Sequence, residues 1–230
     1  MSESQCDYNS MFNSSDAILG YINHFCIQFA DATNEAQFYF DTLVEFIESQ
    51  EQKEIQHLDG VAETVPSNLK GEFWDYHYPY HWRDIFEETL KASFIVSLFS
   101  ILEFYLKCIC PVIYDGKSKK LEEYNKKERF PENFRQYLKG YKSLNLSSLD
   151  WDSIKKLWQI RCIIVHNQGL CSIEKDDEKK LEEFTNENDG ISISNSGINI
   201  DLAFCKRALL TVNKFGIDIG LLIRNYLTNR

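Results

Sequence analysis

The sequence predicts a mainly all-α protein, a helical bundle with one short β-hairpin near residues 191–200. Gly and Pro are scarce, at 10 and 4 of 230 residues, which argues against a many-turned β sandwich. Apolar side chains recur at helical spacing through most of the chain, whereas residues 191–200 alternate between apolar and polar around a turn. With 43% hydrophobic and 14% aromatic residues, the chain can bury a sizeable core.

Two helices and an aromatic loop are predicted in the first third of the chain. Residues 14–16 (Ser-Ser-Asp) can cap an apolar-periodic helix over residues 18–29, and a second helix is predicted over residues 35–55. These two helices can pair as an antiparallel hairpin. Glycines and prolines interrupt residues 57–82, so we expect the aromatic cluster at residues 73–82 to form a loop that packs as a plug.

The longest apolar helix is predicted over residues 84–113. Apolar side chains surround it, which is typical of a helix at the centre of a bundle. Pro111 lies near its end, as expected for a helix breaker. A basic connector follows over residues 117–142, with a short helix around residues 132–141.

A further helix begins at Asp150 or Asp152, either of which can cap it. It stops within residues 166–169, where Asn167 or Gly169 can adopt the left-handed cap conformation.

The rest of the chain is predicted to hold a charged helix, the hairpin and a final amphipathic helix. The charged helix covers about residues 175–184, and the last helix covers residues 202–227. Between them, Asn195-Ser196-Gly197 supplies the hairpin turn.

Charge is distributed unevenly, although the net charge of the chain is −10. Residues 1–90 carry 17 acidic and 3 basic side chains, whereas residues 117–161 carry 12 basic and 6 acidic ones. A basic surface attracts nucleic acid and an acidic one repels it. The candidates for RNA binding are Lys119, Lys120, Lys126, Lys127, Arg129 and Arg135. The aromatic residues interleaved with them, which could stack on bases, are Tyr124, Phe130, Phe134, Tyr137 and Tyr141. The alternative is a solvated connector between helices, because charge runs usually form plain surface.

A soluble, cytoplasmic protein is the expectation. No run approaches the roughly 18 apolar residues of a membrane span, and residues 1–5 lack the features of a secretory signal. The seven cysteines are odd in number and mostly lie in apolar helical stretches, as reduced, buried thiols do.

Neither a metal nor a cofactor is expected. The five histidines show no HExxH or HxH spacing, and the single residue between Cys108 and Cys110 is too few for a zinc-binding pair. The sequence contains no GxSxG elbow, P-loop or GxGxxG turn, which disfavours the common hydrolase, NTPase and dinucleotide-binding classes.

Arg161 and His166 form the candidate catalytic pair. Five residues of regular helix turn about 140° past one full turn, so the two side chains converge only if His166 lies at or beyond the helix end. Histidine exchanges protons near neutral pH, and arginine offers a planar fork to phosphate oxygens. RNA carries its own 2′-hydroxyl nucleophile, so this pair suits metal-free phosphodiester cleavage. Spacing alone favours the alternative, a structural arginine and a helix-terminal histidine stabilised by the helix dipole.

The residues around this pair resemble a known family. The stretch Ile160-Arg161-Cys162-Ile163-Ile164-Val165-His166-Asn167-Gln168-Gly169 is similar to the IRN-x-x-VHN-x-G box of the HEPN superfamily. Members of that superfamily are small α-helical bundles, many of them ribonucleases of toxin–antitoxin and antiviral systems. Residues 97–107 resemble an earlier helix of the family, which often carries an E-x3-K arrangement. The resemblance covers about residues 84–228, so it divides the chain into an N-terminal helical extension, 1–83, and a HEPN-like domain, 84–230.

The resemblance implies a metal-independent endoribonuclease in which the R-x4-H boxes of two copies meet in one cleft. Arg161 would stabilise the pentavalent phosphorane, and His166 would act as general acid or base. Asn167 would orient the phosphate or His166, and Glu103 and Lys107 would be supporting polar groups. The products would carry a 2′,3′-cyclic phosphate and a 5′-hydroxyl. The implied partners are an RNA substrate, a second copy of the chain, and an antitoxin or regulatory protein.

Two positions depart from the family pattern. Cys162 occupies a position where Asn, Asp or His is common, and Gln168 replaces a tyrosine that some members modify. Cys162 and the acidic first third favour a second hypothesis, a non-catalytic HEPN module that binds RNA or a partner protein. A third hypothesis is a helical scaffold in which the pair is accidental and Arg161 is structural.

Overall fold

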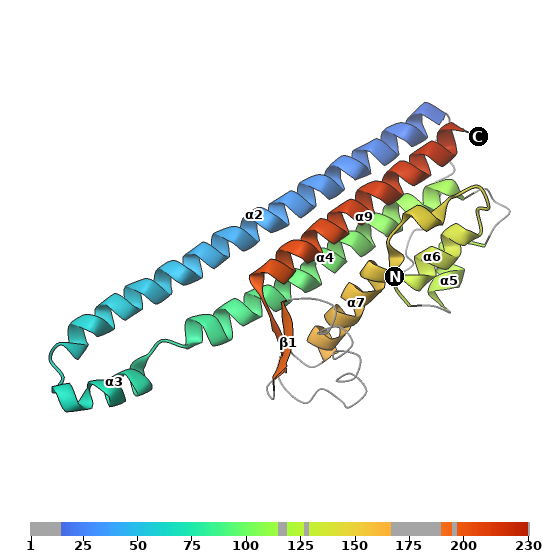
Figure 1. The fold of residues 1–230 in the computed structure, drawn as a ribbon. Coiled ribbons are helices and arrows are strands. Elements are labelled where there is room, and N and C mark those ends of the chain that lie inside the picture. The colour runs from blue at the N-terminus through green and yellow to red at the C-terminus, as the bar shows by residue number, and fades with distance from the viewer. Residues whose placement is uncertain (1–14, 115–118, 127–128, 167–189, 195–196, 230) are drawn as a thin grey trace, which may run out of the picture.

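Three long helices lie side by side and form the body of the protein (Figure 1). They are α2 (Ser15–Ala62), α4 (Glu88–Ile109) and α9 (Leu202–Thr228), and α4 and α9 run antiparallel to α2. The computed structural model describes residues 15–114, 119–126, 129–166, 190–194 and 197–229. Over these residues the protein is mostly helical with one two-stranded antiparallel sheet, which confirms the predicted fold class.

The first helix corrects the prediction of a helical hairpin in the first third. Instead of two helices over residues 18–29 and 35–55, α2 is one continuous helix, about 70 Å long at 1.5 Å per residue. Neither Gly nor Pro interrupts it between these two stretches. Thr33 at the expected break is fully buried, and its hydroxyl donates to the carbonyl oxygens of Phe29 (3.1 Å) and Ala30 (2.9 Å).

The predicted aromatic plug is also wrong. After a 3₁₀ turn (Ser67–Leu69), residues 70–77 form helix α3 (Lys70–His77), which has no buried residue, and Tyr76 is 84% exposed. A π-helical turn (Trp82–Glu87) then leads into α4.

Carboxylates of α2 fasten this segment to the rest of the molecule. The Trp82 indole donates to Glu54 at 2.7 Å, and Arg83 pairs with the buried Glu51 at 2.8 Å. These polar contacts explain why the aromatic cluster stays outside the core.

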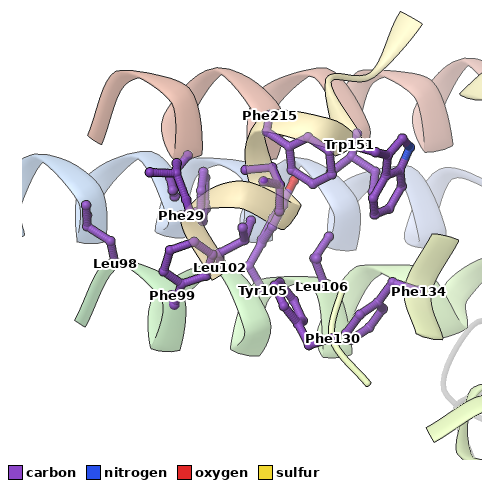
Figure 2. Packing of buried hydrophobic residues seen from close by; sticks show 14 of the residues in the cluster. Phe29, Leu98, Phe99, Leu102, Tyr105, Leu106, Phe130, Phe134, Trp151 and Phe215 are labelled. Carbon is purple, nitrogen blue, oxygen red and sulfur yellow. The ribbon is translucent and has the colours of Figure 1, made fainter. Parts of the chain in front are cut away.

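Helix α4 lies at the centre of the core, as its apolar sequence predicts. Leu98, Leu102 and Leu106 are completely buried between the other helices (Figure 2). Ile22 and Phe40 of α2 belong to the same buried cluster, so the described parts of residues 1–83 and 84–230 share one core. The boundary at residue 84 remains a prediction.

Shorter elements cover the side of α4 that α2 leaves open. The 3₁₀ turn Cys110–Ile113 follows α4, and the basic connector then forms α5 (Leu121–Asn125), α6 (Glu132–Lys139) and the 3₁₀ turn Leu146–Ser148. Helix α7 (Trp151–His166) packs on α4 and α9.

The predicted hairpin is present. Strands β1 (Ile191–Ser194) and β2 (Gly197–Ile200) pair antiparallel, with the buried Ile191 opposite the buried Ile200. The charged helix predicted over residues 175–184 lies outside the described residues.

Among the described residues, one helical stretch is long and apolar enough to cross a membrane, whereas the sequence analysis expected none. It covers Ser67–Ile113, and its most apolar window has a mean hydropathy of 1.8. In α4, which this stretch contains, Phe94, Leu98 and Leu102 face the neighbouring helices, as in the core helix of a bundle. The cytoplasmic location remains a prediction.

The register of α9 on α2 depends on Gly216 and Gly220 of α9, where an added Cβ would overlap side chains of the neighbouring helices. A Cβ at Gly216 would overlap the buried Phe29 ring, which stacks on Tyr105 at 4.4 Å and has no room to move. We expect Gly216→Ala to lower the free energy of unfolding by about 2 kcal/mol, the usual cost of overpacking, measured by urea denaturation.

The matched control is Gly20→Ala in α2, where a Cβ meets nothing within 4 Å. Because alanine favours a helix more than glycine does, this variant should gain about 0.5–1 kcal/mol. Equal stability of the Gly216→Ala variant and the native chain would contradict the packing described here.

Candidate active site

Helix α7 carries the predicted catalytic pair. Its first turn is held by a helix cap and by an aromatic contact with α9. The Ser153 amide donates to Asp150 at 3.0 Å, so Asp150 rather than Asp152 is the capping residue. Hydrogen bonds from the Ser153 side chain and amide lower the pKa of the Asp150 carboxyl. Next to it, the buried Trp151 packs edge-on against Phe215 of α9 at 4.9 Å (Figure 2).

An aromatic column leads from the core to Arg161. The Trp158 ring lies 5.8 Å from Phe99 of α4 and 4.8 Å from Phe130 of the connector. The Arg161 guanidinium lies over the same indole, 4.6 Å from the ring centroid. A cation over a tryptophan face is attracted by the ring quadrupole, so Trp158 holds the guanidinium in place.

Arg161 lacks an acidic partner among the described residues. Its Nε is buried and has no hydrogen-bond partner, and no described carboxylate forms an ion pair with it. A buried donor without an acceptor costs free energy, so the site favours an anion that could accept from the guanidinium.

The described part of α7 runs to His166, so the predicted end of this helix within residues 166–169 stays a prediction. The residues that follow His166, including Asn167, lie outside the described residues, and so does the side chain of His166. The distance between the two members of the candidate pair therefore remains a matter of prediction.

Glu103 and Lys107 form an ion pair of their own at 2.8 Å, one turn apart on α4. The Phe99–Trp158 contact marks where α4 and α7 meet, and the two helices run in opposite directions (Figure 1). Glu103 is four residues past Phe99 and Arg161 is three residues past Trp158. These steps carry the pair and Arg161 apart, by about 6 Å and 4.5 Å along their helices. Within one copy, the structure does not bring Glu103 to Arg161.

The basic candidates of the connector are mostly on the surface. Those that are exposed are Lys119, Lys120, Lys126 and Arg129. Arg135 is half-buried and lies 3.7 Å from Glu132, and Lys127 lies outside the described residues. Arg129 precedes Phe130, so it is the basic side chain that the chain brings nearest to the aromatic column.

The predicted stacking of bases on connector aromatics is wrong. Phe130, Phe134, Tyr137 and Tyr141 are all less than 8% exposed, and Tyr124 packs against the same cluster. Their spacing along the connector is that of the buried side of short helices, which alternation with lysines concealed.

Trp158 is the functional residue that the sequence analysis missed. A tryptophan three residues before an arginine on a helix shares its face, which is a usable signal for a cation–π pair. Among the described residues, no group of three or more His, Cys, Asp or Glu side chains could hold a metal. The described cysteines, which include Cys162, are free thiols.

Comparison with known proteins gives no match. No protein-family model fits this chain, and no curated protein or solved structure is significantly similar to it.

The cap of α7 should make stability depend on pH. Asp150→Ala removes the acceptor for the Ser153 amide, so we expect it to cost about 1 kcal/mol at pH 7, measured by urea denaturation. Because folding lowers the pKa of Asp150, the stabilisation by its charge is present above the unfolded pKa of about 4. That contribution is lost as the pH falls through the lowered folded value.

Asp150→Asn is the control that separates charge from hydrogen bonding. Asparagine caps a helix without titrating, so its stability relative to the native chain should rise as the pH falls below 4. A constant difference between the native chain and the Asn variant from pH 7 to pH 2 would show that Asp150 is not the titrating cap.

Proposed function

We propose that this protein is a metal-independent endoribonuclease of the HEPN type, in which Arg161 and His166 act on the scissile phosphate. One observation carries the proposal. The Arg161 guanidinium lies over Trp158, its buried Nε has no acceptor among the described residues, and it lies five residues before His166, where the described part of α7 stops. A cation that no described carboxylate pairs with suits a phosphate that gains charge during the reaction.

The reaction needs no external nucleophile. The 2′-oxygen of the RNA forms a bond to phosphorus while the bond from phosphorus to the 5′-oxygen breaks. One group takes the proton of the 2′-hydroxyl, and another gives a proton to the departing 5′-oxygen, which leaves a 2′,3′-cyclic phosphate and a 5′-hydroxyl. Histidine suits both tasks because its pKa lies near neutral pH.

Two copies supply the two histidines that base and acid catalysis require. In this proposal the ends of two α7 helices face each other, and Arg161 of both copies contributes to one cleft. Val165, next to His166, is 42% exposed and would lie at such a contact. Asn167 orients the phosphate or His166, while Glu103 and Lys107 act as a supporting pair at a distance from Arg161.

RNA would reach this cleft along the basic connector. The exposed lysine and arginine side chains before Phe130 lead toward the aromatic column. The many acidic side chains of α2 would repel RNA from the other side of the molecule. A ribonuclease of this kind fits a toxin or antiviral effector, which a protein antitoxin or regulator would hold inactive.

A second function, a non-catalytic module that binds RNA or a protein, is favoured by Cys162. This half-buried thiol follows Arg161 where a polar side chain is usual in the family it resembles. The binding module would keep the basic connector and lose cleavage.

Cleavage of RNA in the presence of EDTA tests the proposal. Purified protein incubated with total RNA or tRNA should produce fragments that end in a 2′,3′-cyclic phosphate. We expect His166→Ala and Arg161→Ala to slow cleavage about 100-fold or more, as the loss of an acid–base group or a charge-stabilising donor does. Arg161→Lys, which keeps the charge and loses the planar fork, should lie in between.

Lys155→Ala is the matched control, because Lys155 is an exposed base two turns earlier on α7. It should cleave at the native rate. RNA that stays intact with the native protein, or cleavage that EDTA abolishes, would contradict the proposal. Binding without cleavage would support the binding module instead.

The connector can be tested independently of cleavage. Lys126→Ala and Arg129→Ala should each weaken RNA binding and lower the slope of log affinity against log salt concentration by about 1, because each removes a phosphate contact. The control is Lys53→Ala on the acidic α2. An unchanged salt slope in both connector variants would exclude this stretch as the RNA-binding surface.

A further inference from the structure

The outer face of α2 and α9 exposes apolar side chains that the fold does not use. We call it the α2/α9 face, and its exposed apolar residues are Ile27 (62%), Phe38 (75%), Leu210 (67%), Ile217 (40%) and Leu221 (47%). On α9 the spacing of seven and four residues places the three in one stripe. On α2, Ile27 and Phe38 lie opposite the buried Ile22 and Phe40 sides of the helix. Large exposed apolar side chains that gather on one face of a folded protein mark an interaction site.

The charges on this face have opposite signs on its two helices. The α9 side carries four exposed basic residues and one half-buried acid, Asp218; the basic residues are Lys206, Arg207, Lys214 and Arg224. The α2 side carries the acids Asp31, Asp41 and Glu45 and no base. A face that is acidic on one helix and basic on the next is complementary to itself.

Contacts within the chain fix which residues of the two helices lie level with each other. Gly216 lies against Phe29, Gly220 against Cys26, and Lys206 lies 4.0 Å from Asp41. The two helices are antiparallel, so moving one residue toward the C-terminus of α9 corresponds to moving one residue toward the N-terminus of α2.

By this register, apolar residues of the two helices lie at the same height along the helix axes, and so does one acid with one basic residue. Phe38 is level with Leu210 to within about one turn, Asp31 is level with Lys214, and Ile27 lies between Ile217 and Leu221.

Consider a two-fold axis that lies in the face and runs parallel to the helices. Rotation about it swaps the positions of α2 and α9 and keeps the height of each residue along the helix axes. It places α2 of the first copy over α9 of the second, and α9 of the first copy over α2 of the second. Both contacts belong to one interface. Asp31 of a second copy then faces Lys214, and Phe38 of a second copy faces Leu210. Isologous contacts of this kind require that one surface be complementary to itself.

The available area is sufficient for a stable dimer. The 27 residues of α9 extend about 40 Å, and two helices side by side are about 20 Å wide. The face therefore offers about 800 Å² per copy, the usual size of a specific protein–protein interface.

The groove on the other side of α2 lacks this property. It has a volume of about 600 Å³ between α2 and α4, and Phe25, Ile101 and Phe104 contribute to its apolar lining. The charged side chains that line it are the acids Asp31 and Glu35, so a second copy would meet like charge there. Asp31 lies at the edge between this groove and the α2/α9 face, because it is only about 40° around the helix from Ile27.

We propose that a second copy of this chain docks on the α2/α9 face, with acidic α2 of each copy on basic α9 of the other. This inference does not rest on the proposed function. Helix α7 packs on the side of α9 that carries Phe215, so the α2/α9 contact leaves the Arg161 sites facing outward. A composite active site would need a separate contact between α7 ends, and the two contacts together would build a higher assembly.

Charge reversal tests this docking with the full chain. Sedimentation velocity over a concentration series measures the assembly. We expect Asp31→Lys and Lys214→Glu each to raise the dissociation constant about tenfold or more, since each turns two attractions into two repulsions. The double variant Asp31→Lys/Lys214→Glu should restore the native constant to within about threefold. Leu210→Glu should remove this association step without changing the circular dichroism, because the side chain is 67% exposed.

The matched controls reverse charges elsewhere on the surface. Asp59→Lys lies on α2 beyond the reach of α9, and Lys142→Glu lies on the connector, so both should assemble like the native chain. Three outcomes would overturn the proposal: a native chain that is monomeric at about 100 μM, an assembly that the charge reversals leave unchanged, or a monomer that binds anionic lipid vesicles through Lys214.

Discussion

The antiparallel contact between α2 and the pair α4 and α9 is the constraint on which the other features depend. Phe29 fills the space that Gly216 leaves open and stacks on Tyr105, so one aromatic ring joins all three helices. Interiors at this packing density do not slide, and a shift of one residue would bring Phe29 against a side chain. The contact therefore fixes the level of every residue on α9 relative to α2. It also fixes α4, the surface on which α7 is built.

Contacts between aromatic rings connect the candidate site to this core and fix the position of its side chains. Phe99 of α4 and Phe130 of the connector meet Trp158, and Trp158 supports the guanidinium of Arg161. Arginine on a flexible stem normally loses much side-chain entropy when it binds an anion. A guanidinium already held on an indole has lost part of that freedom in the folded protein, so less is lost on binding.

How much of this could be read from the sequence differs between elements. Helix α7, the hairpin and α9 were predictable because each has a periodic pattern together with a cap or turn residue. The continuity of α2 was not, because the polar residues around Thr33 resemble a break, and the sequence alone does not show that Thr33 itself is buried. Trp158 was missed for a related reason. Its partner on α4 is distant in sequence, and only packing shows that the Arg161 side chain rests on a fixed ring.

The charge asymmetry of the chain acquires a physical role if the α2/α9 face is covered by a second copy. Charges act over about 8 Å at physiological salt, so exposed acids of α2 would weaken the attraction of nearby bases for RNA. Placing Asp31 against Lys214 of a second copy neutralises acids and bases in pairs, and it leaves the connector as the basic surface. That surface contains Arg129, next to the ring that contacts Trp158. Self-association through α2 and α9 would thus cover the basic residues of α9 and leave the connector as the basic surface that an RNA can reach.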